Sequence, residues 1–86
     1  MPTISGFYGI VITMNFREHG PPHIHARYGE HRALVAIDPV APLRNRLPGR
    51  AQGLVLERAS SHREELLANW ARARSEQPLI PVAPLE

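Results

Sequence analysis

Apolar and polar residues alternate along the first half of the chain and then change to a helical spacing. Residues 7–16 are rich in β-branched and aromatic side chains, and residues 23–28 and 31–37 alternate as half-buried strands do. Further on, apolar residues recur three or four positions apart, which is typical of an amphipathic helix. The pattern predicts an α+β fold: a three-stranded antiparallel sheet within residues 1–38 packs on one long C-terminal helix over residues 48–75.

A tight turn is predicted between the second and third strands. Gly29 precedes Glu30 there, and glycine at the first central position is what a type II′ two-residue turn requires. This turn sets Arg27 directly opposite Arg32, and two arginines in that position repel each other unless an anion bridges them. The core face of the hairpin is predicted to carry Ile24, Ala26, Tyr28, Ala33, Val35 and Ile37.

The helix prediction leaves one alternative open. The apolar residues keep the same three-to-four spacing throughout the segment. No glycine or proline lies between residues 53 and 78, and both observations favour a single helix. Residues 61–64, Ser-His-Arg-Glu, nevertheless have the form of a capping box, so two helices divided at Ser61 are the alternative. The stripe expected to face the sheet consists of Ala51, Val55, Ala59, His62, Leu66, Trp70 and Ala73.

Residues 76–86 are predicted to form an extended arm. Proline recurs there at every third position, a spacing that suits polyproline II or irregular extended backbone rather than a central strand. The apolar side chains of the arm would be costly to leave in water, so the arm is expected to dock on its own domain, with insertion into a partner as the alternative. These side chains are Leu79, Ile80, Val82 and Leu85.

Composition sets the class of protein. Eighty-six residues make a single domain, 1–86, and the absence of cysteine excludes disulfides, zinc fingers and cysteine catalysis. The N-terminal residues lack both a basic segment and a long apolar run, so we expect a cytoplasmic protein that does not bind a membrane. All ten basic residues are arginine, and the charge is +4 over residues 1–63 and −2 over residues 64–86. This distribution fits a surface that binds polyanions.

Four of the five histidines lie within residues 19–31. Strand alternation puts His23, His25 and Arg27 on one face of the hairpin, beside Arg32. Histidine next to arginine can provide acid–base groups and phosphate ligands together. His23 and His25 are therefore the candidate catalytic residues, and Arg27, Arg32 and Arg17 are the candidate nucleic-acid or anion-binding residues.

The histidines allow three interpretations. His23, His25 and Glu30 match a metal-binding spacing known from cupin barrels, but the chain is too short for that fold, and we expect neither a metal nor a cofactor. In the second, a histidine acts on a phosphodiester, with Glu18 or Glu30 orienting the imidazole. In the third, the rings are structural and satisfy neighbouring backbone groups.

Several segments also resemble a known family. They are residues 1–5, the block Pro-Pro-His-Ile-His-Ala-Arg-Tyr-Gly-Glu at residues 21–30, residues 54–57, residues 62–66 with Trp70, and the closing Pro-Leu pair. Together they resemble a small bacterial family catalogued as domain-of-unknown-function family 4160, over almost the whole chain. Arg58 departs from that pattern, because tryptophan is more usual there. The resemblance implies a component of a toxin–antitoxin-like pair, encoded beside another short protein.

These observations favour one function and leave two alternatives. The favoured function is that of a component of a toxin–antitoxin-like or regulatory two-protein module that binds RNA or DNA through the face of His23, His25, Arg27 and Arg32. The first alternative is a metal-free RNA-cleaving enzyme that uses His23 or His25, and whether the chain is an enzyme stays open. The second is a pure protein-interaction module. The expected partner is a small protein encoded nearby or a second copy of the chain.

Overall fold

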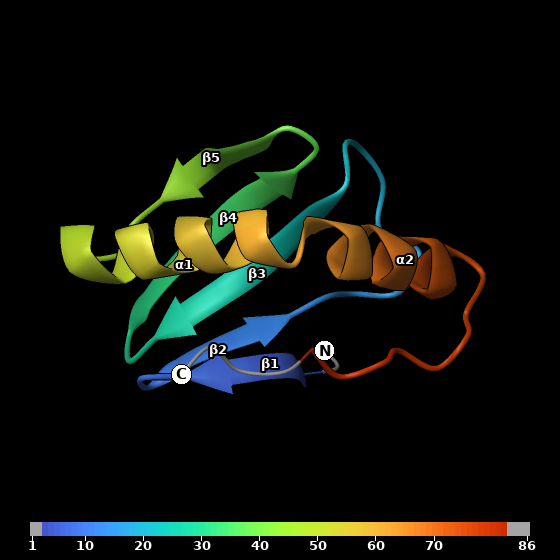
Figure 1. Ribbon diagram of the computed structural model, residues 1–86, viewed down its shortest axis with the longest axis horizontal. Helices are drawn as coiled ribbons and strands as arrows, with labels where there is room; N and C mark the ends of the chain where they lie inside the picture. The colour runs from blue at the N-terminus through green and yellow to red at the C-terminus, as the bar shows by residue number, and fades with distance from the viewer. Residues whose placement is uncertain (1–2, 83–86) are drawn as a thin grey trace.

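Five strands form one antiparallel sheet, and two helices cover one of its faces (Figure 1). The structure, a computed structural model, describes residues 3–82. In chain order the elements are β1 (Thr3–Phe7), β2 (Ile10–Thr13), β3 (His23–Tyr28), β4 (His31–Ile37), β5 (Val40–Asn45), α1 (Gly49–Ser61) and α2 (Arg63–Arg74). Each strand pairs with the next one along the chain. The fold is α+β, but the predicted three strands and single helix are wrong.

The first additional strand arises because residues 7–16 do not form one strand. Tyr8 and Gly9 have φ angles of 51° and 79°, and two consecutive positive angles are the geometry of a type I′ turn. The turn places Phe7 opposite Ile10, so the predicted first strand is interrupted after Phe7, and β1 extends back from there to Thr3. Tyrosine is an unusual residue at the first turn position, so Gly9 was the only sequence signal for this turn.

The second additional strand lies beyond residue 38, where the sheet was predicted to end. The chain turns at Asp38 and Pro39, and Val40 then pairs with Ile37 to begin β5. Pro42 within β5 cannot donate a hydrogen bond, which an edge strand tolerates and a central strand does not. β5 is at the edge of the sheet, so the proline that argued against a strand is compatible with this one.

The hairpin of β3 and β4 has the predicted turn and register. Gly29 has a φ angle of 60°, as the first central residue of a type II′ turn requires. Arg27 lies opposite Arg32, and Ala26 lies opposite Ala33. Five of the six residues predicted for the core face of this hairpin are buried, whereas Tyr28, at the end of β3, is exposed.

The helical segment bends at His62 instead of running straight to residue 75. His62 has φ and ψ angles of −117° and 27°, which separate α1 from α2. No side chain caps α2, so the predicted capping box does not form. The hydroxyl of Ser60 donates to the carbonyl of Leu56 at 2.9 Å, a contact that bends helices. Within residues 3–82, no helix has the length and apolar character needed to cross a membrane.

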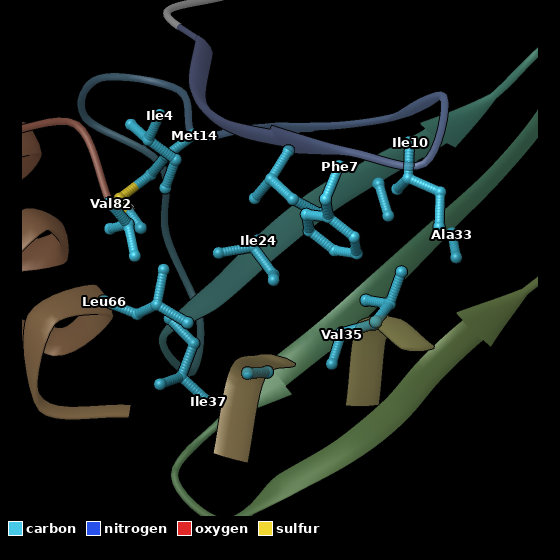
Figure 2. Close-up of a cluster of buried hydrophobic side chains, with 14 of the residues drawn as sticks. Ile4, Phe7, Ile10, Met14, Ile24, Ala33, Val35, Ile37, Leu66 and Val82 are labelled. Carbon is cyan, nitrogen blue, oxygen red and sulfur yellow. The ribbon is translucent and has the colours of Figure 1, made fainter. Parts of the chain in front are cut away.

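One hydrophobic core lies between the sheet and the helices (Figure 2). Ile4, Ile12 and Ile24 supply it from the strands, and Leu66 and Trp70 supply it from α2. Except for His62, all the residues of the predicted helical stripe are buried in this core. The stripe was therefore predicted correctly, although the helix that carries it bends. The opposite face of the sheet carries no helix (Figure 1).

The segment after α2 docks on its own domain. The side-chain amide of Asn69 donates to the carbonyl of Ile80 at 2.7 Å and accepts from the Ile80 N–H at 2.8 Å. The N–H of Val82 then donates to the carbonyl of Ile4 in β1 at 2.7 Å, and the Val82 side chain is buried. The end of the predicted arm, including Leu85, lies outside the described residues. These contacts attach the segment to both α2 and β1.

Arg58 is the least expected member of the interior. Only 3% of it is exposed, and its guanidinium lies 4.5 Å above the centre of the Phe7 ring. Among the described residues, its buried Nε and Nη2 have no hydrogen-bond partner. Burial lowers the pKa of Arg58, because the charged form loses solvation. The cation–π contact therefore offsets only part of the cost of burying this charge.

Replacing Arg58 by methionine should stabilise the protein by about 1 kcal/mol, because methionine fills a similar volume without an unsatisfied charge. Urea unfolding of the wild type and the variant measures the change. The matched control is Arg50→Met, which alters an exposed arginine of the same helix and should change the free energy of unfolding by less than about 0.5 kcal/mol. A loss of stability in Arg58→Met would show that the cation–π contact outweighs the desolvation.

Candidate functional site

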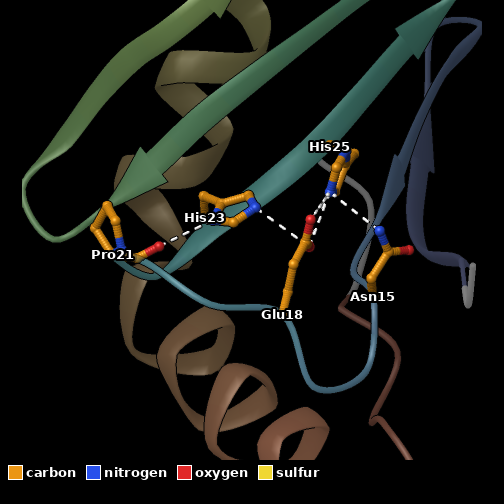
Figure 3. A network of polar contacts seen from close by, with 5 residues as sticks. All are labelled: Asn15, Glu18, Pro21, His23 and His25. Atoms are coloured by element: carbon orange, nitrogen blue, oxygen red, sulfur yellow. Dashed lines mark hydrogen bonds and ion pairs between the residues drawn. The ribbon is translucent and has the colours of Figure 1, made fainter.

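Three side chains that can donate or bind protons converge where β3 begins (Figure 3). They are Glu18, from the loop between β2 and β3, and His23 and His25, from β3 itself. We call these three residues the histidine cluster. The Nε2 atoms of both imidazoles point at the Glu18 carboxylate (Figure 3), and one nitrogen or oxygen from each residue lies within 4.8 Å of the others.

His25 is the more accessible of the two histidines, with 23% of its side chain exposed. Its Nε2 lies 3.0 Å from Oε1 and 3.2 Å from Oε2 of Glu18. The side-chain nitrogen of Asn15 also lies 3.4 Å from the same Nε2. A partly exposed imidazole held by a carboxylate is an arrangement that can transfer protons to or from a bound molecule.

His23 is held more firmly and is nearly inaccessible. Its Nδ1 donates to the carbonyl of Pro21 at 2.9 Å, and its Nε2 lies 3.2 Å from Oε1 of Glu18. The ring lies 5.0 Å from that of Trp70, so α2 covers it. Although alternation places His23 and His25 on the same side of β3, only His25 reaches the accessible surface of the sheet.

Glu18 is the acceptor at the centre of the histidine cluster. Partial burial on its own raises the pKa of Glu18, but hydrogen bonding to His25 and His23 and the electrostatic attraction of these two residues outweigh burial and lower that pKa below its ordinary value. The carboxyl group is therefore ionised at neutral pH. Of the two carboxylates considered from the sequence, it is Glu18 that contacts the imidazoles, while Glu30 lies in the hairpin turn.

The helix-free face of the sheet is hollowed, with a cavity of about 690 Å³. We call this surface the open face. Two rows of side chains cross it from strand to strand. One row runs through Thr13, His25, Leu34 and Arg44, and the other runs through Val11, Arg27 and Arg32. Arg46 follows the second row, since its N–H donates to the carbonyl of Arg32 at 3.0 Å.

The open face contains two of the three predicted anion-binding residues. Arg27 and Arg32 lie side by side in the cavity wall, but Arg17 does not line it. Arg17 pairs instead with Glu76, its Nη2 donating to Oε1 at 2.8 Å, next to the end of α2. His25 lines the cavity and also belongs to the histidine cluster, so the two features meet at this residue.

Arg44 and Arg46 are residues of the open face that were missed from the sequence. Both lie in or just after β5, the strand that was not predicted. Their spacing of two residues was a usable signal, because alternate positions of a strand share a face. Together with Arg27 and Arg32, they give the cavity wall four arginines against one carboxylate, Glu30.

The site therefore combines two capacities in a small space. The open face presents guanidinium groups that can pair with phosphate oxygens. The histidine cluster offers two imidazole nitrogens and a carboxylate oxygen, a set that can transfer protons or hold a metal ion. Because His25 belongs to both, a molecule bound on the open face would lie next to the histidine cluster.

Comparison with known proteins agrees with the resemblance seen in the sequence. No curated protein and no solved structure matches the chain significantly. A family model does match, over residues 9–71, and this span includes the histidine cluster and all four arginines of the open face. The chain belongs to the family described as Domain of unknown function (DUF4160).

Proposed function

We propose that the protein binds nucleic acid through its open face. The observation that carries the proposal is the placement of Arg27 directly opposite Arg32, with Arg44 and Arg46 on the neighbouring edge of the same cavity. Four arginines against one glutamate give the wall a net charge of +3 before the histidines are counted. Such a surface attracts the phosphate backbone of a polyanion.

The opposed arginines support the proposal of a bound anion. Like charges directly opposite on neighbouring strands destabilise a sheet by a few tenths of a kcal/mol or more. A phosphate between the guanidinium groups of Arg27 and Arg32 replaces that repulsion with charge-assisted hydrogen bonds. The pair is thus better suited to the bound state than to the free one.

Recognition is expected to be directed at the backbone and not at the bases. The described residues that line the cavity include no phenylalanine, tyrosine or tryptophan on which a base could stack. Contacts from guanidinium groups to phosphates fix position and carry little sequence information. We therefore expect binding that depends strongly on salt and weakly on sequence.

This binding fits a component of a toxin–antitoxin-like or regulatory two-protein module. The support for this setting is the small size of the domain and the resemblance of its segments to proteins of such pairs. Co-expression with the product of the adjacent gene, followed by purification through a tag on that product alone, tests it. Recovery of the untagged chain in a stable complex is the expected result, and its absence from the eluate would contradict the two-protein setting.

The nucleic-acid proposal is tested by fluorescence anisotropy with labelled single-stranded RNA and duplex DNA over about 50 to about 200 mM salt. If all four arginines contact phosphates, affinity for duplex DNA should fall by about 150-fold across this range. The Arg27→Gln, Arg32→Gln variant should lose about half of that salt slope, because two contacts are removed.

The matched control is Arg72→Gln, Arg74→Gln, which removes the same charge from α2, away from the open face. Its affinity and salt slope should stay close to those of the wild type. If both variants lost affinity equally, the net charge of the protein, and not the open face, would account for binding. No salt-sensitive binding of the wild type to either nucleic acid would overturn the proposal and favour an acidic protein partner for the open face.

A further inference from the structure

We propose that the histidine cluster binds one divalent transition-metal ion through Nε2 of His23, Nε2 of His25 and Oε1 of Glu18. Neither the family description nor the nucleic-acid proposal assigns such a site, and metal binding does not depend on that proposal. It also revises the expectation from the sequence, which considered Glu30 as the third ligand and rejected a metal. The structure places Glu18, and not Glu30, against both imidazoles.

The spacing of the three atoms suits ligation of a single ion. Oε1 of Glu18 lies 3.2 Å from Nε2 of His23 and 3.0 Å from Nε2 of His25. Ligand atoms bound about 2.0–2.1 Å from a tetrahedral zinc ion lie roughly 3.3 Å apart. Small rotations of these side chains would therefore bring all three atoms to bonding distance from one ion.

The hydrogen bond on the far side of His23 selects the tautomer that a metal requires. A carbonyl oxygen only accepts, so the Pro21 carbonyl, 2.9 Å away, fixes a proton on Nδ1 of His23. In the neutral ring, Nε2 then has a lone pair directed at the Glu18 carboxylate. Metal-binding histidines characteristically donate their other N–H to a backbone carbonyl or a carboxylate in this way.

Packing holds the His23 ligand in place. Only 9% of its side chain is exposed, and its ring lies 5.0 Å from that of Trp70. A metal ion between the three residues would satisfy Oε1 of Glu18 and the Nε2 atoms of both histidines together.

The donor set and its exposure define the class of ion. Two imidazole nitrogens and one carboxylate oxygen match catalytic zinc sites and the two-histidine, one-carboxylate sites of iron, whereas Mg²⁺ and Ca²⁺ prefer oxygen ligands alone. Glu18 and His25 are 28% and 23% exposed, so the site is open on their side. Coordination positions left by the protein would be accessible from there to water or to an anion.

Nearby positive charge weakens the site without excluding it. Arg27 lies two residues after His25 on the same strand, and its charge opposes that of the ion. The Glu18 carboxylate supplies a compensating negative charge as a direct ligand. We therefore choose a zinc ion as the probe, because it binds imidazole nitrogen and carboxylate oxygen readily.

The test uses the full chain without a histidine tag, stripped with a chelator and titrated with Zn²⁺ against a chromophoric competitor. We expect one zinc ion per chain, and Glu18→Gln and His25→Asn should each weaken zinc binding by more than about 100-fold. A loss of this size exceeds the 10–100-fold typical of residues that only support a ligand. The matched controls, Glu30→Gln and His31→Asn, change the same residue types at the exposed hairpin turn and should bind as the wild type does.

A second measurement needs no substitution. Trp70 is the only tryptophan of the chain, and its ring lies 5.0 Å from that of His23. Addition of Co²⁺ to the wild type should quench its fluorescence saturably at one equivalent, and Zn²⁺ should reverse the quenching. Absence of stoichiometric zinc binding in the wild type, or unchanged affinity in folded Glu18→Gln and His25→Asn, would overturn the proposal.

Discussion

Replacement of Asn69 by alanine is expected to lower the free energy of unfolding by about 2–3 kcal/mol and to release residues 77–82 from the domain. Asn69 is only 1% exposed, and its amide makes two hydrogen bonds to the backbone of Ile80, at 2.7 and 2.8 Å. Alanine has no side-chain amide, so the substitution removes both hydrogen bonds at once. The expected loss combines two hydrogen bonds of about 1 kcal/mol each with the lost packing of a buried side chain.

Urea unfolding, followed by far-ultraviolet circular dichroism, measures the loss. Truncation after Gln77 should be at least as destabilising, since it also removes the buried side chain of Val82. The two changes should not add, because the truncated chain has no Ile80 for Asn69 to bind. Gln52→Ala, on α1, is the control and should stay within about 0.5 kcal/mol of the wild type. A similarly small change in Asn69→Ala would show that the amide does not hold this segment.

The parts of the fold that were predictable are those in which local chemistry and burial agree. The β3–β4 hairpin was predicted in its register because Gly29 sets the turn and the flanking residues alternate. The buried stripe of the helices was predicted because a spacing of three or four residues needs only the sequence. In both cases one short-range rule determines the structure.

The parts that were missed depend on neighbours that the sequence does not show. Tyr8 adopts a positive φ angle in a turn, although tyrosine favours strands, and Pro42 is acceptable only because β5 is an edge strand. The division of the helix near Ser61 was only the alternative prediction, because the apolar spacing continues through the bend at His62 without a break. Tertiary packing decides each of these positions, so local propensity gave the wrong answer.

The candidate site was predictable in its composition and less so in its geometry. Arg27 and Arg32 followed from the hairpin register, and His23 and His25 followed from their strand. The choice of Glu18 over Glu30 depends on how the loop between β2 and β3 folds back over β3, which no sequence rule supplies. For the same reason, burial of His23 under Trp70 could not be foreseen.

Reversing the charge of Arg32 is expected to move stability and nucleic-acid affinity in opposite directions. Arg32→Glu replaces a repulsive pair with an ion pair across the strands, since Arg27 lies directly opposite. The free energy of unfolding should rise by about 0.5–1 kcal/mol. On the open face, the same change removes one phosphate ligand, adds a negative charge and engages Arg27. Affinity at low salt should fall more than about 10-fold, and the salt slope should drop by about two contacts.

A gain in stability together with a loss of nucleic-acid affinity in Arg32→Glu would show that the arginine pair serves binding and not stability. Arg74→Glu alters the net charge equally on α2, and it should change neither property by a comparable amount. Thermal unfolding and anisotropy titrations of the same protein samples give both quantities. If Arg27 and Arg32 have only a structural role, Arg32→Glu should bind nucleic acid as Arg74→Glu does. If instead Arg32→Glu lowers stability and affinity together, the two guanidinium groups do not repel each other in the free protein, and the argument for an anion between them fails.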